Sequence, residues 1–134
     1  MSELNFKVNL ADIKEELSDL PGIYESWSSK LAKASNDAYN LKLSNRVLRA
    51  KTEIDIRQNP LNYGFPKLTE GTVTAVLESN AAVVASDKEL SDTEAEVRVI
   101  RAIVESLEVK RSSLKYLCEL ANSGFLNLSP ITGT

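Results

Sequence analysis

One irregular stretch, residues 57–70, lies between two long helical patterns and constrains the fold more than any other part of the chain. Pro60 removes a backbone donor and disfavours helical geometry at Asn59. Gly64 and Pro66 keep the following residues irregular. A long helix must therefore end here, and the chain must turn before another begins.

A new helix is expected directly after this junction, because Thr69 supplies an N-cap and Glu70 an acidic first turn. Two helical arms joined in this way form a helical hairpin or bundle, so we expect an all-α, elongated single domain over residues 1–134. Its expected parts are a short N-terminal helix at about 10–19, a long basic helix at about 22–58, the junction at 59–68, a helical region at about 69–123 and an irregular tail.

Two further breaks are expected inside these helical regions. Asn9 is a plausible cap for the short first helix, and Pro21 with Gly22 should interrupt or redirect that helix. Ser79 and Asn80 indicate a second break, after which the helical pattern resumes at Ala81. At the other end, residues 123–125 (Ser-Gly-Phe) indicate a helix stop.

The long basic helix carries one continuous set of apolar or small side chains at steps of three and four residues, with Asn45 as its polar member. The other members are Tyr24, Trp27, Leu31, Ala34, Ala38, Leu41, Leu48 and Thr52. A second apolar stripe lies beside it and consists of Leu43, Val47, Ala50 and Ile54. Because one partner helix covers one face, the second stripe implies another neighbour, in a bundle or an oligomer.

A heptad pattern runs through the closing helix and gives it the best packing surface of the chain. One heptad position holds Leu90, Val97, Val104, Arg111 and Cys118, and the other holds Thr93, Ile100, Leu107, Leu114 and Ala121. Aromatic residues make up only 6% of the chain, although 43% of it is hydrophobic. With so few large side chains for a compact core, we expect self-association as a homo-oligomer.

The residue inventory points away from catalysis, so we expect no enzyme and no cofactor. The chain has no histidine, its one cysteine has no histidine to activate it, and no phosphate-binding glycine loop is present. The acidic residues between 87 and 96 lack the ligand order of a calcium loop, which favours a solvated helix face and no metal site. The sequence shows neither a signal peptide nor a membrane span, so a cytoplasmic protein is expected.

The net charge of −3 conceals an uneven distribution. Residues 26–58 hold seven basic and three acidic side chains, whereas residues 69–109 hold three basic and nine acidic ones. A basic helix face suits the phosphates of single-stranded nucleic acid, and Tyr39, Tyr63 and Phe65 could add stacking surface. A solvated surface is the plain alternative. The candidate nucleic-acid-binding residues are Lys42, Arg46, Arg49, Lys51, Arg57 and Lys67.

Several segments in a fixed order resemble the UvsY-like recombination mediators of tailed phages. They are residues 20–27 (Leu-Pro-Gly-Ile-Tyr-Glu-Ser-Trp), the basic run 46–51, the junction 56–60, residues 63–70, and Leu114, Leu117, Leu120 and Gly124-Phe125 near the end. The resemblance covers roughly residues 20–125. It departs at Ser123, where related proteins often have a basic residue.

The resemblance implies a small helical protein that binds single-stranded DNA and assists loading of a RecA-type recombinase in phage recombination and repair. By position, Arg49 and Lys51 would contribute to DNA binding. The family forms rings, and the residues expected in such an oligomer interface are Val97, Ile100, Val104, Leu107, Leu114, Leu117 and Phe125. The implied partners are single-stranded DNA, the recombinase and a single-strand-binding protein inside the infected host cell. The alternative is a helical phage structural or assembly protein that binds no nucleic acid.

Overall fold

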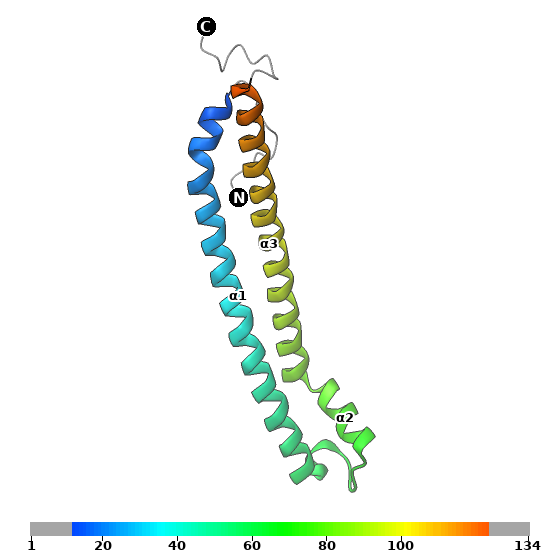
Figure 1. Cartoon of the computed structure of the whole chain (residues 1–134). Coiled ribbons are helices and arrows are strands. Elements are labelled where there is room, and N and C mark those ends of the chain that lie inside the picture. The colour runs from blue at the N-terminus through cyan, green and yellow to red at the C-terminus, as the bar shows by residue number, and fades with distance from the viewer. Residues whose placement is uncertain (1–11, 124–134) are drawn as a thin grey trace. The chain divides into compact units, whose positions relative to one another are not determined.

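The computed structural model describes residues 12–123, all of whose regular structure is helical. The elements are α1 (Ile13–Gln58), the 3₁₀ helix η2 (Pro60–Tyr63), α2 (Glu70–Ser79) and α3 (Ala81–Asn122). Contacts divide the chain into two units, one made of residues up to Ala32 together with those from Arg98, and the other of Lys33–Val97. In each unit a segment of α1 packs antiparallel to a segment of α3 (Figure 1). The expected all-α hairpin is therefore confirmed.

The first unit is held together by apolar side chains repeated every seven residues. Its buried members are Ile13, Leu20 and Trp27 on α1, and Ile100, Val104, Leu107 and Leu114 on α3. Seven-residue spacing keeps a side chain on one face of a helix over two turns, so both helices present a continuous apolar edge. The heptad pattern on α3 thus packs within the chain, against α1.

Polar contacts flank the core of the first unit. The Tyr24 hydroxyl donates to Glu108 at 2.7 Å, and this bond raises the pKa of Tyr24 above its ordinary value. The Lys110 ammonium lies 3.7 Å from the Glu16 carboxylate, and both side chains are largely covered. Arg111, which lies in a heptad position, is exposed and stacks over the Tyr24 ring.

The expected break at Pro21 and Gly22 is wrong, because α1 runs through both residues without interruption. Proline removes one backbone hydrogen bond of a helix and crowds the carbonyl four residues earlier. That cost is local, whereas Leu20 and Trp27 are buried on either side of the site and hold the backbone helical. Gly22 meets no neighbouring atom that a larger side chain would touch. The proposed cap Asn9 lies outside the described residues.

The junction forms as expected and adds a short 3₁₀ turn. Pro60 occupies the first turn of η2, and Gly64 ends η2 in the left-handed region at φ 85°. The Phe65 amide then donates to the Pro60 carbonyl at 3.1 Å. A residue with a Cβ would be strained at the Gly64 backbone angle, so the turn depends on glycine at this position.

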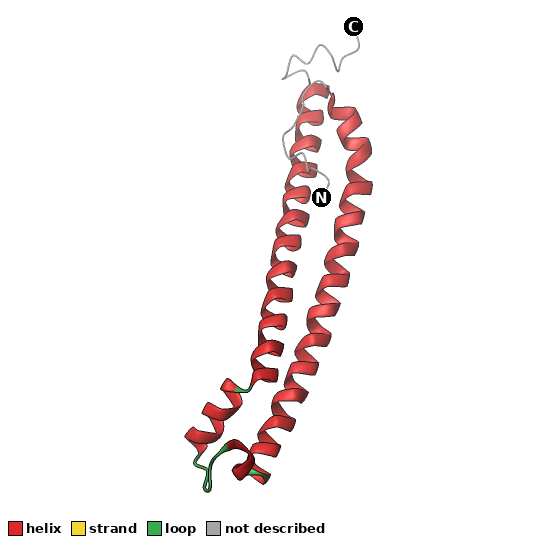
Figure 2. Cartoon of the chain, turned by 180° about the vertical axis from the view of Figure 1, so that it is seen from behind, coloured by secondary structure: helices red, strands yellow, loops and turns green. Residues whose placement is uncertain are grey.

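Two side-chain caps, Thr69 and Asn80, begin the helices α2 and α3, and loop residues lie on both sides of α2 (Figure 2). The Thr69 hydroxyl accepts from the Thr72 amide at 3.3 Å, which confirms Thr69 as the N-cap of α2. The Asn80 side chain accepts from the amides of Ala82 and Val83 at 3.0 and 3.2 Å and so starts α3. The expected break at Asn80 is therefore confirmed.

Asn45 is the buried polar side chain of the second unit. Its amide nitrogen donates to the Ser86 hydroxyl at 2.9 Å and to the Asp87 carboxylate at 2.7 Å. Because a buried amide without partners would be costly, these bonds fix which part of α1 lies beside α3. The buried apolar residues of the second unit are Ile56, Val73, Val83 and Val97.

The tail beyond Ser123 lies outside the described residues, as does the expected helix stop at Gly124-Phe125. The helix α3 ends at Asn122, and a turn follows at Ser123. Within residues 12–123, no helix combines the length and apolarity needed to cross a membrane.

Candidate nucleic-acid interface

Lys42 and Arg46 are the most accessible part of the expected basic stripe. They lie one turn apart on α1, in the second unit, and both are exposed. Neither forms an ion pair with any residue in the described range 12–123. Two cations on one helix face, free of acidic partners, can each meet a phosphate of a passing strand.

Arg49 lies on the same edge of α1, but acidic side chains already hold its guanidinium. It donates to the Asp87 carboxylate on α3 at 2.8 Å and also forms an ion pair with Glu78 on α2. The bond to Glu78 is the main reason that the pKa of Arg49 is raised. Only 29% of the Arg49 side chain is exposed. Arg49 thus ties α1 to both other helices, and a phosphate would have to displace an acid to reach it.

Arg57, at the end of α1, is likewise held by acidic side chains. Its two terminal nitrogens donate to the two carboxylate oxygens of Glu70 at 2.9 and 2.8 Å, and Glu53 lies 3.7 Å away. These contacts raise the pKa of Arg57 and lower that of Glu70. The paired arrangement joins the last turn of α1 to the first turn of α2, across the junction. Arg57 is therefore engaged within the chain.

Lys51 and Lys67 are exposed but do not extend the edge that carries Lys42 and Arg46. Lys51 follows Arg46 by five residues, which places it about 140° further around the helix. There it borders a shallow hollow with Leu43, Ser44, Val47 and Leu48. Lys67 lies in the loop before α2. The structure therefore brings together Lys42, Arg46 and Arg49, and places Arg57 about three turns beyond Arg46 on the same side of α1, where Glu70 holds it. Lys51 and Lys67 lie elsewhere on the second unit.

The aromatic candidates differ in how available their rings are. Tyr39 is 60% exposed, three residues before Lys42, and is free to stack on a base. The Tyr63 hydroxyl instead donates to the Asp55 carboxylate, which raises the pKa of Tyr63. Phe65 is exposed at 36% in the loop that follows η2. Tyr39 is thus the aromatic residue best placed to assist Lys42.

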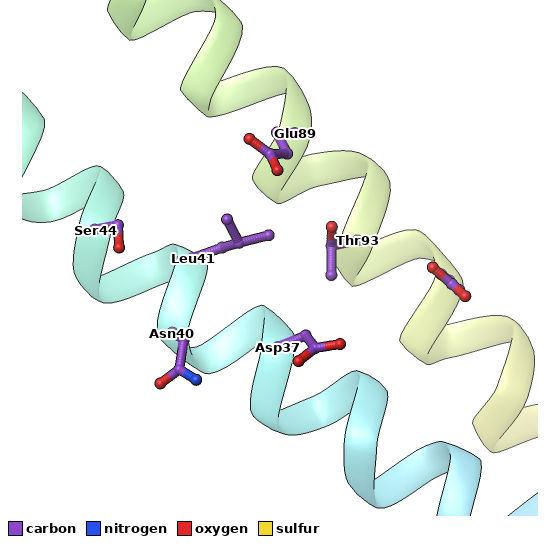
Figure 3. Close-up of a pocket in the computed structure, with 7 residues that line it drawn as sticks. Asp37, Asn40, Leu41, Ser44, Glu89 and Thr93 are labelled. Carbon is purple, nitrogen blue, oxygen red and sulfur yellow. The ribbon is translucent and has the colours of Figure 1, made fainter.

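An open groove of about 460 Å³ lies between α1 and α3 in the second unit (Figure 3). Its carboxylates are those of Asp37, Glu89 and Glu96, and Leu41 points from α1 toward α3. Helical periodicity places Asp37 and Lys42 on opposite edges of α1, about 140° apart. Because carboxylates repel phosphate, this groove is unsuited to nucleic acid. Within residues 12–123, no group of three or more acidic or cysteine side chains is placed to hold a metal ion.

The residues expected in an oligomer interface are largely covered within one chain. Val97, Ile100, Val104, Leu107 and Leu114 are all buried, and Leu117 is half-buried. Phe125 lies outside the described residues. An oligomer built on these side chains would have to open the α1–α3 packing, so their role in assembly stays a prediction. The second apolar stripe of α1 is instead exposed, with Val47 at 51% and Ile54 at 53%.

The acidic partners of the arginines were missed at the level of sequence. Asp87 was assigned to a solvated face, yet it accepts hydrogen bonds from both Asn45 and Arg49. The signal that could have found it is the junction itself. Once the chain turns at residues 59–69, the last turns of α1 must lie beside α2 and the start of α3, where the acids are concentrated.

Comparison with known proteins adds no family assignment. The chain matches no protein-family model, and neither a curated protein nor a solved structure is significantly similar to it.

Proposed function

We propose that this protein binds single-stranded DNA through the edge of α1 that carries Lys42 and Arg46. The observation that carries the proposal is that these two cations are exposed, one turn apart and unpaired within residues 12–123. A sequence-tolerant binder needs positive donors spaced along a track and an aromatic surface nearby, and Tyr39 supplies the latter. The contact would depend on salt and little on base sequence.

The resemblance to the UvsY-like mediators supports a more specific role within the same proposal. The protein would hold the strand for a RecA-type recombinase and assist its loading, next to a single-strand-binding protein, without catalysis of its own. Several copies in a homo-oligomer, as in the rings of that family, would each contribute a short basic edge. Linked weak sites bind together far more tightly than one site alone.

Arg49 and Arg57 extend this site only when their acids give way. Glu78 and Glu70 both lie on α2, and each neutralises one of these arginines. A phosphate that replaced either carboxylate would gain a charge-assisted contact but would also loosen the hold on α2. We therefore assign the first contacts to Lys42 and Arg46, and only secondary ones to Arg49 and Arg57.

Replacement of both first-contact residues tests the proposal. The double variant Lys42→Ala/Arg46→Ala should weaken binding to every single-stranded sequence and lower the salt slope by roughly 1.4, at about 0.7 for each lost phosphate contact. The control is Arg98→Ala/Lys115→Ala, which removes the same charge from exposed positions on α3. If the two double variants weakened DNA binding equally, Lys42 and Arg46 would not be the binding site. If neither variant changed DNA binding, the proposed function would be contradicted.

A helical structural or assembly protein is the second candidate. It is favoured by the exposed apolar stripe on α1 and by the internal pairing of Arg49 and Arg57, which shortens the basic track. In that case the protein would associate without nucleic acid, and single-stranded DNA would not bind at low salt. Because both functions are compatible with self-association, the measurement of single-stranded DNA binding at low salt separates them.

A further inference from the structure

The exposed apolar stripe of α1, made of Leu43, Val47, Ala50 and Ile54, has no partner within the described residues. Its large members are between 39% and 53% exposed, and Ala50 is exposed as well. All four side chains share one face, because steps of three and four residues return to the same side of a helix. Four apolar side chains in a row on one helix face mark a surface that another helix can cover.

The spacing of this stripe is the same in both directions. Its steps are four, three and four residues, so the pattern maps onto itself when the helix is turned end for end. A partner with the same spacing, running antiparallel, can therefore match every side chain in the stripe. A second copy of this chain carries that spacing by definition, and a two-fold axis would pass between Val47 and Ala50.

We propose that two copies of this chain pair antiparallel through the stripe. Leu43 would then pack against the partner's Ile54, and Val47 against the partner's Ala50, each twice because of the two-fold symmetry. The small side chain of Ala50 lets the helices approach closely at the centre of the pair. This surface lies in the second unit and uses none of the heptad residues on α3.

Charge on one flank of the stripe matches the same arrangement. Arg46 and Glu53 lie seven residues apart on this flank, on opposite sides of the two-fold axis. Antiparallel pairing faces each flank with itself, which brings Arg46 opposite the partner's Glu53 and gives two ion pairs. In the paired form a phosphate would have to displace this carboxylate to reach Arg46, whereas Lys42, four residues earlier, lies outside the contact and keeps its charge for DNA. Arg46 is exposed and unpaired within residues 12–123, and the contact of Glu53 with Arg57 is long, at 3.7 Å.

The other flank adds no attraction, so the register of the pair is set by the apolar stripe and by the flank that carries Arg46 and Glu53. Lys51 would lie beside the partner's Ser44, and the two Lys51 ammonium groups would share this flank. Shifting the register by one turn would separate Arg46 from the partner's Glu53 and place apolar side chains against polar ones. The attractive flank and the palindromic spacing thus select the same alignment.

Matched valine variants test the surface in sedimentation equilibrium without nucleic acid, up to about 300 µM protein. Val47→Gln should weaken self-association at least about tenfold, because it places an amide in the apolar contact twice. The control is Val109→Gln, at a valine that is 66% exposed on α3. A wild-type chain that stays monomeric, or equal effects of the two variants, would overturn the proposal.

Charge exchange tests the alignment separately. Arg46→Glu and Glu53→Arg, taken singly, should each weaken association by placing like charges opposite one another, whereas the double variant should restore it. A double variant no better than the singles would contradict the ion pairs. Circular dichroism of each variant monitors helicity, so that loss of association is not confused with unfolding.

A spin label at Gln58, introduced as Gln58→Cys with Cys118→Ser, tests the direction of pairing. Antiparallel copies place the two labels roughly 30 Å apart along the helices, because each residue adds about 1.5 Å of rise on both sides of the axis. Parallel copies would place them near the interaxial distance of about 10 Å. The short distance would overturn the antiparallel pair.

Discussion

Arg49 on α1 and Asp87 on α3 are joined by a hydrogen-bonded ion pair of 2.8 Å, and the same guanidinium reaches Glu78 on α2. One side chain therefore connects all three α-helices at the start of α3. The acidic contacts of Arg49 have two consequences that can be tested separately: they stabilise the packing of the helices, and they compete with phosphate for its guanidinium.

The first consequence is structural. Arg49→Ala should lower the free energy of unfolding by about 1 kcal/mol, because it removes two charge-assisted bonds at a partly covered site. Lys51→Ala, which removes the same charge from an exposed residue two positions away, should change it by less than about 0.5 kcal/mol. Urea unfolding of both variants measures the difference. Equal stabilities would show that the contacts of Arg49 contribute nothing net.

The second consequence concerns DNA binding. Glu78→Gln weakens one of the two acidic contacts of Arg49, so it should raise affinity for single-stranded DNA by more than a change of net charge alone. Glu96→Gln is the matched control. It also removes one negative charge, but from the open groove between α1 and α3, away from the edge of α1 that carries Lys42 and Arg46. Fluorescence anisotropy at one salt concentration compares them. If both variants gained the same affinity for single-stranded DNA, Arg49 would not be part of the DNA site.

Acid should loosen the connection between Arg57 and Glu70. The pKa of Glu70 is lowered by the hydrogen bonds and charge of Arg57, so the pair adds stability above the unfolded-state pKa of about 4.3. This stability is lost as the pH falls through the lower folded-state pKa. Carbon NMR of the Glu70 carboxyl group should give a depressed pKa that returns to its ordinary value in Arg57→Gln. An unchanged titration in that variant would contradict the contact.

Leu114 tests whether the α3 heptad serves the chain itself. It is fully buried, so Leu114→Ala should cost about 2–5 kcal/mol of unfolding free energy, while Val109→Ala on the exposed face should cost much less. Because the packing is within one chain, the size of this loss should not depend on protein concentration. A loss that grows on dilution would instead place Leu114 in an interface between subunits.

The helical fold could be predicted from the sequence because its signals are local. Thr69 and Asn80 cap the helices that follow them, as their short polar side chains suggest, and Gly64 takes the one left-handed angle among residues 12–123. Pro21 shows where local signals fail. The helix continues through Pro21 because Leu20 and Trp27 are buried on either side of it. That burial depends on α3, which is distant in the sequence, so no local pattern could predict it.

The candidate site was less predictable, for the same reason. The positions of Lys42 and Arg46 on one exposed face follow from helical periodicity alone. The pairing of Arg49 with Asp87 and Glu78 depends on how α2 and α3 return along α1, and no pattern around Arg49 records it. The exposure of the second stripe, Leu43 to Ile54, is likewise a property of the tertiary packing.

The central claim is that the exposed edge of α1 binds single-stranded DNA through phosphate contacts. A salt titration of the wild-type protein against unrelated single-stranded oligonucleotides tests it most directly. We expect binding to all of them at low salt, with affinities that fall linearly in logarithmic plots at a slope of about −0.7 for each phosphate contacted. No detectable binding below about 100 mM salt, where such contacts are least screened, would contradict the claim.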